Sequence, residues 1–280
     1  MRIALCNEVI RELDFAGQCA LAKALGYDGL EVAPFTLSDE PHRLPAARRA
    51  ELRRVAEDRG LTITGLHWLL VTPEGLSITN PDAAVRLRTV EVMGGLIELC
   101  TDLGGRILVH GSPRQRAVEP GDTREAALGR AKDCFAAIAT DAGRAGVVYC
   151  IEPLAPAETE LINTVEEAAA IVEEVGNPAL RTMIDCCAAG QSERAPVPDL
   201  IARWLPGGHV AHVHLNDPNR RGPGQGEMRF APVLAALRRL NYPGICSVEP
   251  FVYEPDGPSC AARAIGHVRG ILEALAGQPA

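Results

Sequence analysis

The sequence has no long hydrophobic run. Its first six residues are mostly apolar, but polar Asn7 and Glu8 follow at once, which makes this segment too short for the apolar region of a secretory signal. Nowhere does an uninterrupted apolar stretch approach the roughly 20 residues that a membrane-spanning helix needs. We therefore expect a cytoplasmic protein with no membrane partner.

The sequence also lacks an excess of positive charge and a paired set of cysteines. Lys and Arg number 28 against 36 Asp and Glu, the formal net charge is -8, and the basic residues are scattered. Because a nucleic-acid-binding face gathers basic residues, nucleic acid is not an expected partner. The nine cysteines are odd in number and irregularly spaced, and Cys186 and Cys187 are adjacent, so buried reduced thiols are expected rather than disulfides.

The sequence does contain a regular alternation of short apolar runs and longer helical patterns. Each apolar run is followed by a polar or Gly/Pro-containing loop and then by an Ala- and Leu-rich segment with helical spacing. Glycines such as Gly26, Gly60 and Gly146 follow helical segments, where a left-handed capping residue is favoured. The predicted strands are 2–6, 29–33, 62–67, 106–110, 147–152, 181–185, 210–215 and 245–249. The predicted helices are 13–25, 46–59, 82–103, 124–145, 165–175, 197–204, 231–240 and 259–275.

Eight strands alternating with eight helices predict an α/β protein that folds as a single (β/α)8 TIM barrel. Strands too apolar to be half exposed are typical of parallel sheets covered by helices. An open doubly wound sheet would usually bring a glycine-rich phosphate loop after the first strand, but this position reads Cys6-Asn7-Glu8-Val9. A length of 280 residues suits one barrel, and no linker interrupts it, so we expect one domain over 1–280.

Polar residues end several predicted strands, which is where a TIM barrel places its active site. Because the ends of the strands meet at one mouth, side chains from the last four strands should converge there. Three close carboxylates repel one another, and a divalent cation relieves that repulsion. Three oxygen ligands and one imidazole favour Mn²⁺, with Mg²⁺ or Co²⁺ as alternatives, over Zn²⁺. We predict one divalent metal ion held by Glu152, Asp185, His214 and Glu249.

The same segments resemble the xylose isomerase-like TIM-barrel superfamily, specifically its sugar phosphate isomerase/epimerase branch, which includes the ketose 3-epimerases. The resemblance is loose over the whole chain and most specific within 151–251. Four motifs carry it: Ile151-Glu152-Pro153 with Glu158 and Asn163-Thr164; Asp185; His212-Val213-His214-Leu215-Asn216-Asp217 with Arg220 and Pro223-Gly224-Gln225-Gly226; and Val248-Glu249-Pro250-Phe251.

The resemblance implies a role for each matching residue. It places the metal on the same four residues that end the strands, and it makes Glu152 and Glu249 the groups that exchange protons on opposite faces of the substrate carbon. Glu158 and Arg220 are implied as substrate contacts. Three histidines at or near the strand ends are further candidates for substrate binding: His67, His110 and His212.

The resulting hypothesis is a metal-dependent isomerase or epimerase acting on a sugar or keto-sugar. It would remove a proton alpha to a metal-bound carbonyl and pass through an enediolate. A lyase or dehydratase on a keto-sugar, keto-glycoside or keto-inositol is the alternative, because it begins with the same proton abstraction. Ketose epimerases carry a substrate-binding histidine three residues after the strand-six aspartate, and this chain has Ala188 there, which keeps the alternative open.

Two other classes fit less well. The endonuclease IV group shares the barrel, but its phosphodiester chemistry needs more metal ligands and a basic groove, which seven histidines and a net charge of -8 disfavour. A non-catalytic sugar-binding protein would have little reason to retain buried carboxylates. The expected partner is a small sugar-like molecule, and a homo-oligomer is the alternative to a monomer.

Overall fold

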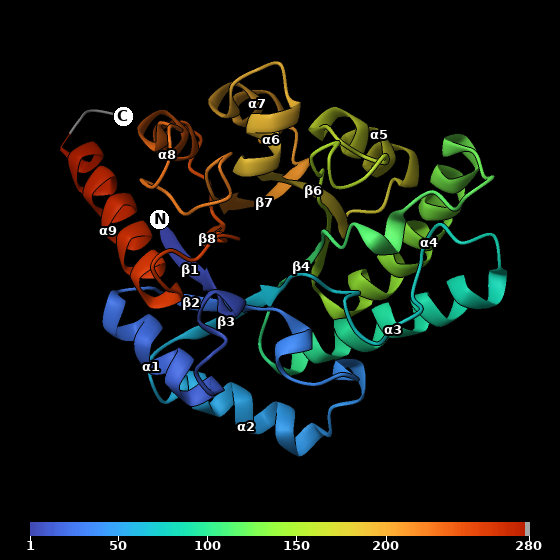
Figure 1. The fold of residues 1–280 in the computed structure, drawn as a ribbon, viewed down its shortest axis with the longest axis horizontal. Coiled ribbons are helices and arrows are strands. Elements are labelled where there is room, and N and C mark those ends of the chain that lie inside the picture. Colours follow the sequence, from blue (N-terminus) through green and yellow to red (C-terminus); the bar gives the residue numbers. More distant parts are fainter. Residues whose placement is uncertain (278–280) are drawn as a thin grey trace.

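The computed structural model describes residues 1–277, which form a closed barrel of parallel strands surrounded by helices (Figure 1). Strands that are consecutive in the sequence are neighbours in the sheet, and β1 pairs with β8 to close the ring. The predicted (β/α)8 barrel is therefore confirmed. Its strands are β1 (Arg2–Cys6), β2 (Gly29–Val32), β3 (Thr62–Leu66), β4 (Ile107–His110), β5 (Val148–Ile151), β6 (Leu180–Asp185), β7 (Val210–Leu215) and β8 (Ile245–Val248).

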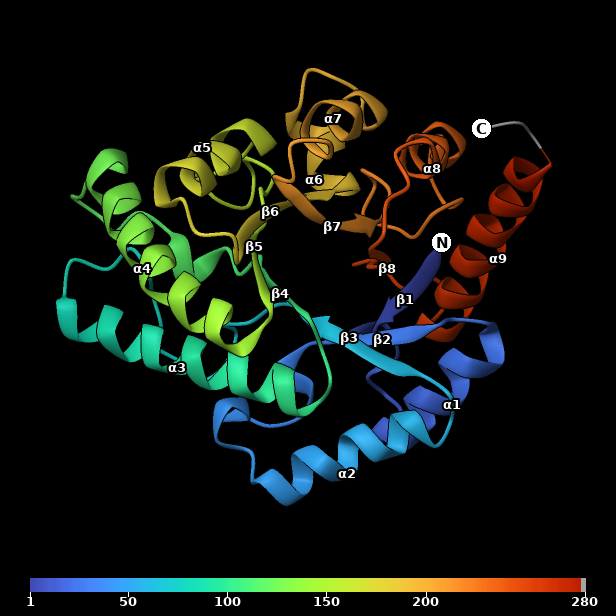
Figure 2. The ribbon, with the colours of Figure 1, turned by 180° about the vertical axis from the view of Figure 1, so that it is seen from behind.

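The helices form the outer layer, and the view from behind shows them on the outside of the strands as well (Figure 2). Within the described residues, none of them combines the length and apolarity needed to cross a bilayer. The α-helices are α1 (Phe15–Leu25), α2 (Ala46–Glu57), α3 (Ala83–Asp102), α4 (Arg124–Ala145), α5 (Val165–Val175), α6 (Cys186–Ser192), α7 (Val197–Trp204), α8 (Phe230–Arg239) and α9 (Gly257–Ala276). Short 3₁₀ helices in the loops are η1 (Asn7–Ile10), η2 (Pro34–Thr36), η3 (Pro41–Arg43) and η4 (Arg114–Arg116).

Helix α6 was not expected from the sequence. It starts directly after β6, because the side chain of Asp185 accepts a hydrogen bond of 2.7 Å from the backbone N–H of Ala188 and so caps the first turn. With only seven residues, the helix is too short to show a helical period in the sequence. Its first turn lies at the mouth of the barrel, next to the predicted metal ligands.

The barrel is apolar at its middle and charged toward the carboxyl ends of its strands. Val109, Cys150 and Met183 form a small buried cluster on the inward face. The larger core lies between strands and helices. The register pairs Met183 with His212 and Asp185 with His214, so the layer below the mouth holds both apolar and ionisable side chains, whereas the pair at the mouth is ionisable on both strands.

Candidate metal centre

The four predicted metal ligands lie together at the mouth of the barrel. One donor atom from each lies within 4.8 Å of the others, and all four residues are buried. Asp185 and His214 are register partners at the ends of β6 and β7, while Glu152 and Glu249 directly follow β5 and β8. The candidate ligand set is therefore assembled by four consecutive strands, and its binding of metal stays a prediction.

The spacing inside the candidate ligand set suits coordination of an ion. His214 Nδ1 lies 2.8 Å from Glu249 Oε2, 3.6 Å from Glu152 Oε1 and 3.8 Å from Asp185 Oδ2. Within the described residues, this nitrogen and Glu249 Oε2 are buried and make no well-aligned hydrogen bond. In an octahedral site with bonds of about 2.1 Å, adjacent donors stand about 3.0 Å apart and opposite donors about 4.2 Å.

The electrostatics of the metal-free centre also favour a cation. Burial raises the pKa of Glu249 to about 7, and burial together with Glu152 raises the pKa of Asp185 well above its ordinary range. Burial alone would lower the pKa of His214, but Glu249 and Glu31 raise it well above the usual value. Without metal the centre therefore retains protons, and a divalent ion would displace them.

Glu31 is the most important residue that the sequence did not reveal. It is fully buried on β2 and lies beneath the candidate ligand set, with Oε1 3.0 Å from His214 Nε2 and Oε2 2.7 Å from His212 Nε2. The Ser247 hydroxyl donates to the same carboxylate. Burial would raise the pKa of Glu31, but the two histidines lower it well below its usual range, so the carboxylate stays ionised. The only available signal was one charge inside the apolar run Leu30-Glu31-Val32.

The position of His212 corrects one prediction. Substrate contact was expected, but the imidazole lies one layer below the mouth, on the inward face opposite Met183, and binds Glu31. It is two residues before His214 on β7, so both rings face inward at different depths. His212 therefore supports Glu31 rather than facing the substrate.

The carboxylates of the candidate ligand set are oriented by neighbours. Asn216 donates to Asp185 Oδ2 at 2.6 Å, and the Trp68 indole donates to Glu249 Oε1 at 3.0 Å. Trp68 has a φ of 52°, in the left-handed region, which places its indole at the mouth. Such partners fix ligand orientation before an ion arrives.

A pocket lies directly above the candidate ligand set. Trp68 and Phe251 line it together with Glu158 and Gly111, and a Cβ at Gly111 would meet Glu152 Oε2 at 1.5 Å and so would displace that carboxylate. Arg220 lies 3.6 Å from Glu158, and its guanidinium lies 4.9 Å from the centre of the Phe251 ring. Its φ of 70° is left-handed, and its carbonyl accepts from the Phe251 and Val252 N–H groups. The pair Glu158–Arg220 therefore lies at the rim, where substrate contact was predicted.

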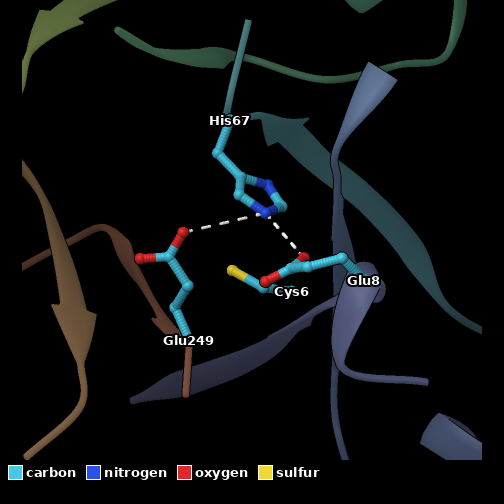
Figure 3. A group of neighbouring side chains, drawn as sticks. All are labelled: Cys6, Glu8, His67 and Glu249. Atoms are coloured by element: carbon cyan, nitrogen blue, oxygen red, sulfur yellow. Dashed lines mark hydrogen bonds and ion pairs between the residues drawn. The ribbon is translucent and has the colours of Figure 1, made fainter. Parts of the chain in front are cut away.

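The two remaining histidines differ in position. His67 follows β3 at the mouth, with Nε2 2.7 Å from Glu8 Oε2 and 3.8 Å from Glu249 Oε1 (Figure 3). His110 points away from the pocket: its Nδ1 lies 2.8 Å from the Tyr149 hydroxyl, and its ring packs edge-on against Phe135 of α4. Burial lowers the pKa of His110 to about 3. The prediction of substrate contact by His110 is corrected, because Val109 takes the inward position and leaves His110 facing the helices.

Comparison with known proteins identifies the family to which this barrel belongs. Residues 19–271 match the family model described as xylose isomerase-like TIM barrel. The chain belongs to this family. Its relatives include a D-psicose 3-epimerase of Enterocloster bolteae, 28% identical over 233 residues that cover 82% of this chain and 75% of the relative. Another D-psicose 3-epimerase, of Agrobacterium fabrum, is 29% identical over 240 residues, covering 81% and 76%.

A solved structure shows the same fold. D-psicose 3-epimerase with D-tagatose from Clostridium cellulolyticum H10 superposes with a TM-score of 0.83 at 21% identity, covering 97% of this chain and 99% of that chain. The predicted membership in the xylose isomerase-like superfamily is thereby confirmed, with ketose 3-epimerases among the relatives.

Proposed function

We propose that the protein is a divalent-metal-dependent epimerase that acts on a sugar or keto-sugar. The observation that carries this proposal is the convergence of the candidate ligand set beneath a pocket, with one glutamate from β5 and one from β8. The D-psicose 3-epimerases among its relatives support the same reaction class. Mn²⁺ is the ion we expect, with Mg²⁺ or Co²⁺ as alternatives, because three of the four ligands are carboxylates.

The bound ion would supply the positive charge that a carbonyl oxygen needs while the neighbouring carbon loses a proton. The chain would supply the proton transfer. Glu152 and Glu249 follow strands separated by β6 and β7, so they address the pocket floor from different sides. One glutamate would take the proton to give a planar enediolate, and the other would return it to the opposite face.

The rim pair would position the substrate for this transfer. Glu158 is an acceptor and Arg220 a fixed cation, and together they can bind a substrate hydroxyl or carbonyl from above. Trp68 and Phe251, whose rings lie 6.3 Å apart, form an apolar wall over the centre. An apolar wall with few polar groups suits a flat sugar intermediate and limits the entry of water.

The test is solvent exchange. Mn²⁺-loaded protein is incubated with ketoses and keto-sugars in D₂O, and NMR identifies the carbon that gains deuterium. Wild type should exchange one proton and produce the epimer at that carbon, whereas Glu152→Gln and Glu249→Gln should slow both by at least about 100-fold, as expected for loss of a general acid or base. Glu173→Gln, an exposed change on α5, is the control.

Two outcomes would contradict the proposal. The first is a Gln variant that binds metal and still turns over like wild type, which would remove that glutamate from the proton transfer. The second is deuterium exchange followed by loss of a substituent, which would replace epimerisation by the lyase alternative.

A further inference from the structure

A second group of ligand-type side chains lies beside the candidate ligand set. It consists of Cys6, Glu8, His67 and Glu249, called here the Cys6 cluster (Figure 3). One donor atom from each lies within 4.8 Å of the others, and all four residues are buried. We propose that the Cys6 cluster is a second metal site, which takes Zn²⁺ or Co²⁺ and shares Glu249 with the first.

An unpartnered carboxylate oxygen in the cluster supports the binding of a cation there. Glu8 is 6% exposed, and its Oε1 is buried without a hydrogen-bond partner within the described part of the chain. Leaving a carboxylate oxygen buried and unpaired is costly. Figure 3 shows the Cys6 sulfur between the carboxylates of Glu8 and Glu249, below the His67 ring. A cation in this space would contact all four donors.

The charge around the cluster is negative. Across residues 1–277, the ion pairs of Glu8, Glu31 and Glu249 all involve histidines, and none involves a lysine or arginine. One divalent ion in the candidate ligand set would be bound by Glu249, but it would leave Glu8 and Glu31 paired with imidazoles alone. A second cation would balance the remaining charge, and zinc-type ions bind such buried carboxylate and imidazole groups readily.

Glu249 can serve both sites, because its two oxygens face different neighbours. Oε2 lies 2.8 Å from His214 Nδ1, while Oε1 lies 3.8 Å from His67 Nε2. The two donor sets also differ in chemistry. A thiolate and an imidazole select Zn²⁺ or Co²⁺, whereas three carboxylates and one imidazole suit Mn²⁺. The second site rests on the proposed function only in sharing Glu249, since its other three ligands belong to no part of the proton transfer.

Cobalt provides a direct test, because thiolate coordination gives Co²⁺ a charge-transfer absorption band. Protein loaded with Mn²⁺ is titrated with Co²⁺, and elemental analysis follows both ions. Wild type should bind a second ion and develop the band. Cys6→Ser should abolish the band and weaken Co²⁺ binding at least tenfold, as expected for a lost ligand. Cys187→Ser is the matched control, because this thiol lines the pocket above the first site and lies outside the cluster.

A second variant keeps the thiol in place. Glu8→Gln should weaken Co²⁺ binding at least tenfold while Mn²⁺ binding is unchanged. If the Cys6→Ser variant does not fold, Glu8→Gln takes its place in the test. The inference is overturned if wild type takes up no second ion, if the band survives in Cys6→Ser, or if folded Glu8→Gln binds Co²⁺ like wild type. Asp185→Asn separates the two proposals: it should lose Mn²⁺ and keep the band, so a protein without epimerase activity can still confirm the second site.

Discussion

Glu31→Gln should weaken binding at the candidate ligand set although Glu31 is not a member of it. The ionised carboxylate can only accept hydrogen bonds, so its contact of 3.0 Å places the imidazole hydrogen of His214 on Nε2. When an ion displaces the second proton of His214, Nδ1 is the nitrogen left with a lone pair, on the side of the carboxylates of Glu152, Asp185 and Glu249. A glutamine amide can donate to Nε2 instead, which would move the hydrogen to Nδ1, the atom that should bind the ion.

The expected magnitude follows from two independent estimates. A hydrogen bond to a charged group contributes about 1.5–3 kcal/mol, and loss of a group that orients a metal-bound histidine typically lowers affinity about 10–100-fold. These values agree, since about 1.4 kcal/mol corresponds to a factor of ten. Calorimetric titration of Mn²⁺ into wild type and Glu31→Gln should therefore show a dissociation constant raised about 10–100-fold.

Ser247→Ala is the matched control for this substitution. It removes the hydroxyl that donates to Glu31 and leaves the charge of Glu31 and its contact with His214 in place. Its affinity for Mn²⁺ should change by less than about threefold, the lower end of what one neutral hydrogen bond contributes. If Glu31→Gln has native circular dichroism and binds Mn²⁺ as tightly as wild type, the tautomer argument is wrong.

Two further predictions concern pH and the rim of the pocket. In metal-free protein, the folded pKa of Glu249, about 7, lies above its ordinary value of 4.5, so its contribution to stability is present below pH 4.5 and lost as pH rises through 7. Urea unfolding in chelator should show lower stability at pH 8 than at pH 5, a loss that Mn²⁺ reverses, and equal stability at both pH values would refute this. Glu158→Gln and Arg220→Ala should keep Mn²⁺ affinity and Tm but lower kcat/KM about tenfold or more, and unchanged kinetics on the identified substrate would remove both from the pocket.

The barrel could be predicted because each strand is a compact apolar run bounded by turn residues. The predicted and observed strands differ at their ends. The strands predicted over 62–67, 147–152 and 245–249 each extend one residue past the observed end, at His67, Glu152 and Glu249. These residues lie where the strand leaves the sheet and its side chain turns to the mouth, so the sequence cannot separate the end of the strand from the start of the site.

The candidate ligand set could be predicted for a related reason, since each member lies at or next to the end of a different strand. Glu31 and Glu8 could not, because they lie inside β2 and in η1, and only the closed ring brings them beneath the mouth. The sequence also could not show that the side chain of His110 points away from the barrel interior. Strands covered by helices are apolar on both faces, so Val109 and His110 show no alternation that would mark which side chain faces inward.

Ala188 links the local sequence to the substrate. It lies in the first turn of α6 and lines the same pocket as Glu158. The resemblance to ketose epimerases implies a substrate-binding histidine at this position. A methyl group there offers no hydrogen bond, so in the proposed function polar recognition above the candidate ligand set would fall to Glu158 and Arg220. These two side chains are 25% and 49% exposed, and a partly exposed rim pair leaves more room for a bulky substrate than a buried imidazole would. We therefore expect sugars with a substituent on the side of α6 to be better substrates than free ketoses, and comparing kcat/KM for the two would show whether this is so.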